Sequence, residues 1–128
     1  MLRRTQVDEL EKLIGQMDSL HSELTTLAKK SPNDAVNNFK LRFVNTSLNN
    51  CNKLFGKKYR PFDDFDQFDT DDVPSNSDLT FVISQYIQAL EKFRADNLRR
   101  DSIGNWIYDI EDSEDHIRTT IPAKLRKK

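Results

Sequence analysis

The sequence predicts a mainly α protein, an antiparallel three-helix bundle with a long coiled-coil-like N-terminal helix and a C-terminal β-hairpin or short helix. Apolar residues recur at helical three-and-four spacing in three segments. Stretches rich in Pro, Ser, Asn and Asp separate these segments, as turns do. The chain has 128 residues, which suits one domain because single domains cluster at about 100–150 residues. We therefore expect a single helical domain over residues 1–128.

The first helix is predicted over residues 5–29 by a narrow row of apolar residues. These residues step by three and four positions across three heptads, unlike the broader apolar stripe of an ordinary surface helix. Such a row needs a partner helix, so we expect it either to pack inside the bundle or to mediate self-association as a homodimer. This leucine seam consists of Leu10, Leu13, Met17, Leu20, Leu24 and Leu27.

The second helix is predicted to begin at Ser31 and Pro32, which favour an N-cap and a first helical position. It is predicted to end at Gly56. Its broad apolar face includes Phe39 and Phe43. The short connection to the first helix predicts that the two are antiparallel neighbours.

An acidic loop rich in Phe and Asp is predicted over residues 57–77, where Pro61 and Pro74 interrupt the helical spacing. Residues 61–78 contain seven Asp and no Lys or Arg. As a recognition element, the loop would use its aromatic side chains as anchors and its acids to attract a basic partner. Alternatively, the phenylalanines cap the bundle and the aspartates are simply solvated, which we favour for a chain with a thin core. The candidate partner-binding residues are Phe62, Asp63, Asp64, Phe65, Asp66, Phe68, Asp69, Asp71 and Asp72.

The third helix is predicted to start near Ser77 or Asp78 and to continue through Leu98, with basic residues near its end. Residues 104–121 alternate apolar and polar side chains on both sides of a run of five polar residues. This pattern favours a β-hairpin over a helix, which the spacing of the apolar residues also allows. Residues 122–128 form a basic tail after Pro122.

Composition favours a small cytoplasmic protein–protein interaction module, such as an adaptor, accessory subunit or inhibitor. The near balance of 20 Lys and Arg against 21 Asp and Glu argues against a generally basic nucleic-acid binder. No apolar run reaches the about 18 residues of a membrane span, and the N-terminus lacks the apolar region of a secretory signal. The single cysteine, Cys51, fits a reducing compartment. We therefore expect another protein as the partner, no membrane and a cytoplasmic location.

We predict no catalytic residues, no metal site and no cofactor. His21 and His116 do not stand at metal-ligand spacing with each other or with Cys51, whose place in an amphipathic helix indicates a core residue. The aspartates of the loop do not follow the EF-hand register. Three alternatives stay open: nucleic-acid binding through the basic residues of 57–60 and 124–128, nucleic-acid mimicry by the acids, and a metal-dependent enzyme built on carboxylates.

Overall fold

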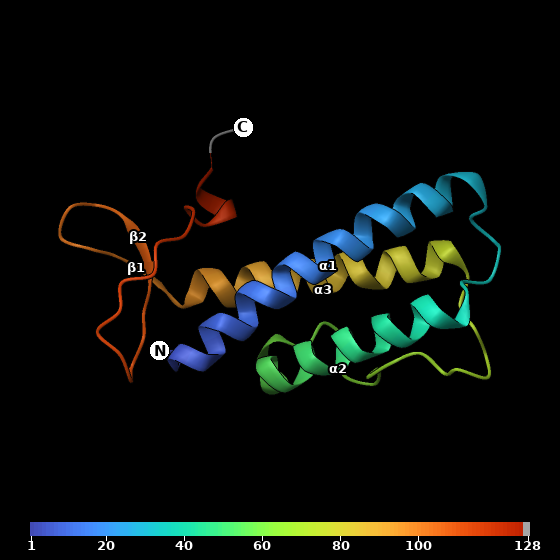
Figure 1. Cartoon of the computed structure of the whole chain (residues 1–128), viewed down its shortest axis with the longest axis horizontal. Coiled ribbons are helices and arrows are strands. Elements are labelled where there is room, and N and C mark those ends of the chain that lie inside the picture. Colours follow the sequence, from blue (N-terminus) through green and yellow to red (C-terminus); the bar gives the residue numbers. More distant parts are fainter. Residues whose placement is uncertain (127–128) are drawn as a thin grey trace.

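Three helices and a small C-terminal sheet make up residues 1–126, the part of the chain that the computed structural model describes (Figure 1). The helices are α1 (Arg4–Lys30), α2 (Asn38–Tyr59) and α3 (Asn76–Asp96). The strands β1 (Leu98–Arg100) and β2 (Trp106–Tyr108) pair antiparallel, and a short 3-10 helix, η1 (Ala123–Leu125), follows. The predicted fold class, a mainly α bundle with a C-terminal hairpin, is confirmed. Lys127 and Lys128, the end of the predicted tail, lie outside the described residues.

Helix α1 runs antiparallel to α2 and α3, whereas α2 and α3 run in the same direction (Figure 1). Their N-terminal ends lie together. Val36 and Pro74 each lie two residues before their helix, and the backbone N–H of Val36 donates to the carbonyl of Pro74 at 3.0 Å. Their last turns also lie together, where the Tyr59 hydroxyl donates to Asp96 at 2.7 Å. The connection between them, residues 60–75, must therefore return along the whole length of α2. We call residues 60–75 the acidic connection.

The leucine seam packs within the bundle. Leu10, Leu13, Met17 and Leu24 are buried, and the other two seam residues are half-buried against the same core. A dimer that used these side chains would first have to open the bundle, at the cost of re-exposing the apolar side chains that α1 buries. Self-association through the seam stays a prediction, and one that the packing of the single chain does not favour.

The start predicted for α2 is wrong. Asn37, and not Ser31, caps this helix, since its side chain accepts the backbone N–H of Lys40 at 2.8 Å. The segment that holds Ser31 and Pro32 instead pairs with the start of α3, where the N–H of Asn76 donates to the carbonyl of Asp34 at 2.9 Å. Backbone pairing with a distant part of the chain therefore outweighs the local helix signal at Ser31 and Pro32.

Gly56 kinks α2 but does not end it. Its φ of 60° lies in the left-handed region that glycine adopts without strain, and helical structure resumes beyond it to Tyr59. The end predicted for α3 also differs, because the helix stops at Asp96 and Leu98–Arg100 forms β1.

The hairpin uses a different partner strand from the one predicted. Arg99 pairs with Ile107 in the β1–β2 register, and the loop between these strands lies before Trp106. The predicted partner, residues 117–119, lies on the other edge of β2 and joins it by a single antiparallel bridge between Ile107 and Arg118. The segment after the acidic residues 111–115 therefore returns to β2 as expected, but only at this bridge.

Candidate functional site

Three asparagines on one face of α2 hold the acidic connection in place. Asn45 makes two hydrogen bonds of 2.9 Å with the backbone N–H and carbonyl of Phe68. Asn52 donates to the carbonyl of Asp66 at 3.1 Å, and Asn49 donates to the side chain of Gln67 at 2.7 Å. The middle of the connection is thus attached to α2 by side chains, although it contains no helix or strand. These asparagines were not among the predicted site residues, although their spacing of four and three places them on one helix face.

The three phenylalanines of the connection turn toward the bundle. Phe62, Phe65 and Phe68 are half-buried and pack against the core. Their rings form a row, with centroid distances of 5.8 Å from Phe62 to Phe65 and 5.0 Å from Phe65 to Phe68. Phe62 also lies 6.5 Å from the buried ring of Tyr86. These side chains therefore contribute more to packing than to the outer surface.

The aspartates of the connection all face solvent. Asp66 forms an ion pair with Arg60, and Asp69 accepts the backbone N–H of Asp71 at 2.8 Å. The four remaining carboxylates form no side-chain hydrogen bond or ion pair within residues 1–126. These free carboxylates belong to Asp63, Asp64, Asp71 and Asp72.

Exposed aromatic side chains lie on α2 beside this acidic surface. Phe39 is 64% exposed and Phe43 is 50% exposed, with ring centroids 4.9 Å apart. The guanidinium of Arg42 lies over both rings, at 5.5 and 5.7 Å from their centroids. The apolar face of α2 is thus narrower than predicted, because Val44 and Leu48 face the core and the two phenylalanines point away from it. We call Phe39, Arg42 and Phe43 the aromatic cluster.

A groove of about 620 Å³ separates the aromatic cluster from the acidic connection. Phe39 and Arg42 line one side, and Gln67 and Thr70 line the other. Asn49 lies on the floor, where its amide and that of Gln67 hold one another in place. Groove, aromatic cluster and acidic connection together form one candidate interaction surface.

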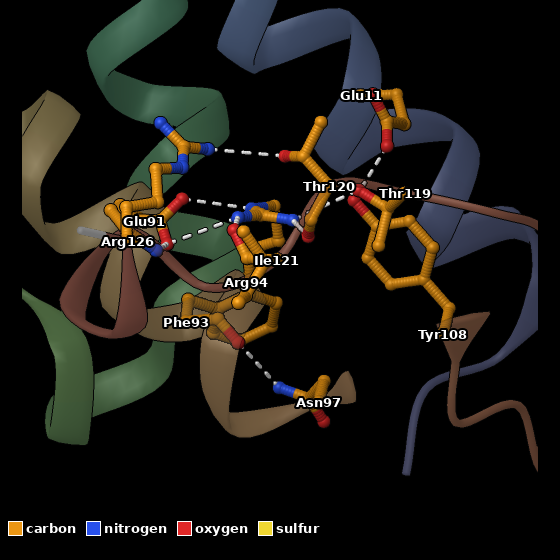
Figure 2. A network of polar contacts seen from close by, with 11 residues as sticks. Glu11, Glu91, Phe93, Arg94, Asn97, Tyr108, Thr119, Thr120, Ile121 and Arg126 are labelled. Carbon is orange, nitrogen blue, oxygen red and sulfur yellow. Dashed lines mark hydrogen bonds and ion pairs between the residues drawn. The ribbon is translucent and has the colours of Figure 1, made fainter. Parts of the chain in front are cut away.

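A second hollow, a cleft of about 630 Å³, lies between α1, α3 and the C-terminal segment. Arg94 of α3 is only 4% exposed and forms five hydrogen bonds there, which Figure 2 shows. Two of them go to Glu91, at 2.8 and 3.1 Å. The others reach the side chain of Thr119 and the carbonyls of Thr120 and Ile121. Arg94 thus fastens the C-terminal segment to α3, a role that its position near the helix end did not reveal.

The ionisable groups of this network are tuned by their surroundings. Burial raises the pKa of Glu91, but hydrogen bonds from Arg94 and from the N–H of Ala123 outweigh it and lower the pKa below the ordinary value. Burial raises the pKa of Tyr108, and the Glu11 carboxylate, which accepts its hydroxyl at 2.5 Å, raises it further. Both groups therefore keep their usual charge states near neutral pH, as structural residues do.

The environment of Cys51 and the placement of possible metal ligands bear on catalytic chemistry in the described chain. Cys51 is completely buried, and burial, with a smaller contribution from Glu9, raises the pKa of its thiol to about 12. Such a thiol is protonated near neutral pH and is a poor nucleophile. Within residues 1–126, no three His, Cys, Asp or Glu side chains come together as metal ligands would.

The basic segments 57–60 and 124–126 do not meet. The first ends α2 and the second lies in and after η1, and Figure 1 shows these two ends well apart. A continuous basic surface made of both is therefore not formed.

Comparisons with protein-family models, curated proteins and solved structures find no match for this chain. None of the helices in the described part of the chain is both long and apolar enough to cross a membrane.

Proposed function

We propose that this chain is a protein–protein interaction module that binds a basic segment of another protein. The observation that carries the proposal is a groove with the exposed ring of Phe39 on one side and Gln67 and Thr70 of the acidic connection on the other. Hot spots of protein interfaces are enriched in aromatic residues and Arg, and charged residues at the rim add association rate and specificity. The aromatic cluster and the acidic connection have these two properties.

The acidic connection supports a basic partner. Asp63, Asp64, Asp71 and Asp72 lack partners within the described chain, so their charges are available to another molecule. A cluster of like charges raises the electrostatic energy of the free protein, and a partner that carries Lys or Arg relieves this repulsion. The carboxylates lie at intervals along an irregular segment, which suits an extended chain better than a single bound ion.

The aromatic cluster supplies the apolar part of the surface. Phe39 is 64% exposed and Phe43 is 50% exposed, and their rings pack edge to face. Arg42 restricts both rings from above, which lowers the side-chain entropy that a partner would have to remove on binding. The groove beside Phe39 has amide and hydroxyl groups that can bond to a peptide backbone.

This function agrees with a non-catalytic protein of the cytoplasm. The single cysteine of the chain is buried, as expected of a free thiol in a reducing compartment.

The proposal is tested by capture experiments with nuclease-treated lysate, in which the retained proteins are identified and then remeasured as purified partners. One variant carries Asp63→Asn, Asp64→Asn, Asp71→Asn and Asp72→Asn, and its control removes four exposed or half-exposed acids elsewhere. The control variant carries Glu9→Gln, Asp34→Asn, Glu111→Gln and Glu114→Gln. A further variant carries Phe39→Ser and Phe43→Ser.

A basic partner should bind the control variant like the wild type. The connection variant should bind it at least about tenfold more weakly, with a smaller dependence on salt concentration. The aromatic variant should lose about 2 kcal/mol or more, as hot-spot residues do. Equal binding by all variants, or partners that are retained from untreated lysate but not from nuclease-treated lysate, would contradict the proposal.

A further inference from the structure

The cleft between α1, α3 and the C-terminal segment has the properties of a small-molecule site. Its volume of about 630 Å³ lies within the range of ligand pockets, roughly 300–1,000 Å³. Ile14 of α1 and Ile87 and Leu90 of α3 give it an apolar floor. Charged residues from α1, from α3 and from the C-terminal segment stand around this floor.

Most of the buried charge in the cleft is already neutralised. Glu91 and Arg94 form a two-point ion pair, and the remaining Arg94 donors bind the C-terminal segment (Figure 2). Glu11 accepts the Tyr108 hydroxyl at 2.5 Å. These groups shape the walls of the cleft, and a ligand has no need to pair with them.

Three charged side chains that line the cleft have polar atoms without a hydrogen-bond partner in the described chain. The exposed side chains of Asp18 on α1 and of Arg118 form no hydrogen bond or ion pair within residues 1–126, and Arg118 also borders a neighbouring hollow that contains Asp101. Arg126 donates only one hydrogen bond to a side chain, to the Thr120 hydroxyl at 3.1 Å. The cleft therefore offers one free negative group on the side of α1, two basic groups on the side of the C-terminal segment, and an apolar floor between them.

We infer that this cleft binds a zwitterion of the amino-acid type, either a free apolar amino acid or a short apolar peptide with free ends. The ammonium group of the ligand pairs with Asp18 and its carboxylate with Arg118 and Arg126, while its side chains cover the floor. Guanidinium groups suit a carboxylate because their donors can bind both of its oxygens. The opposite signs of the two sides of the cleft set the direction of the ligand.

The ligand chemistry is tested by calorimetric titration of the full chain with leucine, Leu-Leu and Leu-Leu-Leu. Which of the three binds best distinguishes a free amino acid from a peptide. N-acetyl-Leu-Leu lacks the ammonium group and Leu-Leu-amide lacks the carboxylate. Each capped form should bind at least about tenfold more weakly than Leu-Leu.

Variants assign each end of the ligand to its residues. Arg118→Gln with Arg126→Gln should weaken the binding of Leu-Leu by about tenfold and leave the binding of Leu-Leu-amide unaffected. Asp18→Asn should weaken the binding of Leu-Leu by about tenfold and leave the binding of N-acetyl-Leu-Leu unaffected. Arg3→Gln with Lys53→Gln, and separately Glu114→Gln, remove the same numbers of charges outside the cleft and should change nothing. The inference is wrong if none of the free-ended ligands binds at millimolar concentration, if capping has no effect, or if the cleft variants bind like the wild type.

Discussion

Asn45 attaches the acidic connection to α2, so its replacement by Ala should destabilise the fold measurably. The side chain is only 7% exposed and makes two hydrogen bonds of 2.9 Å with the backbone of Phe68. Each bond contributes about 1 kcal/mol net, and a backbone group left without a partner costs about 1–3 kcal/mol unless water replaces it. Because the site is at the surface of the bundle, water can reach it in part. We expect the free energy of unfolding to fall by about 2–3 kcal/mol.

Asn49→Ala is the matched control, because it removes one exposed hydrogen bond, to the side chain of Gln67. Both replacements gain about 0.6 kcal/mol of helix propensity, so this contribution cancels in the comparison. Urea unfolding followed by circular dichroism and by Trp106 fluorescence measures both variants. Asn45→Ala should also speed hydrogen exchange at the amide of Phe68. A loss equal to that of the control, or an unchanged exchange rate, would refute the assigned role.

Four further predictions concern stability. Arg94→Met should lower the free energy of unfolding by about 3–5 kcal/mol, because Glu91 then keeps a partly buried charge without its partner; adding Glu91→Met should recover part of the loss, and no recovery would show that the pair is not responsible. Phe65→Ala removes a half-buried ring and should cost about half of the 3–5 kcal/mol of a fully buried one; an unchanged melting curve would place this ring outside the packing. Gly56→Ala should cost about 1–3 kcal/mol, because its φ of 60° strains any other residue even though an added Cβ meets no atom within 4 Å. Gly15→Ala, in the regular part of α1, should instead stabilise by about 0.5–1 kcal/mol, so the same sign at both glycines would contradict the assignment. Finally, the pKa of Glu91 in the folded chain lies below its ordinary value of 4.5, so the stability it contributes is complete above that value and is lost as the pH falls through the folded pKa. Glu91→Gln should remove this part of the pH dependence of stability. If the variant and the wild type lose stability equally between about pH 5 and pH 2, Glu91 makes no such contribution.

Helical spacing predicted the three helices because the core is built from it. Four of the five buried residues of α1 lie in the predicted row, and the fifth, Val7, precedes it by three positions. Helix α3 begins within two residues of its predicted start. The spacing was less informative for α2, where Phe39 and Phe43 stand at helical distance from each other but not on the face that Leu41, Val44 and Leu48 form. When one helix carries two overlapping apolar rows, the spacing alone does not show which row faces the core.

Chain direction and long-range polar contacts could not be predicted from local patterns. The acidic connection is long enough to link α2 and α3 in either orientation, and only the contacts at both helix ends show that they run in parallel. Likewise, the carbonyls that Arg94 binds lie more than 20 residues away along the chain. Local charge rules place such an arginine at a helix end because of the dipole, and they contain no information on a distant backbone acceptor.

The two irregular segments of this protein are held by buried polar side chains, whose hydrogen bonds are made within the chain. Asn45 fixes the acidic connection, and Arg94 fixes the C-terminal segment that forms one side of the cleft. A surface fixed in this way loses little conformational entropy when a partner binds. Substitutions should then separate the two properties. Replacing Asn45 or Arg94 should lower stability, whereas replacing exposed groups such as Asp72 and Arg118 should affect only binding. A small core can thus support two preorganised surfaces, because a few desolvated hydrogen bonds order segments that apolar packing alone leaves mobile.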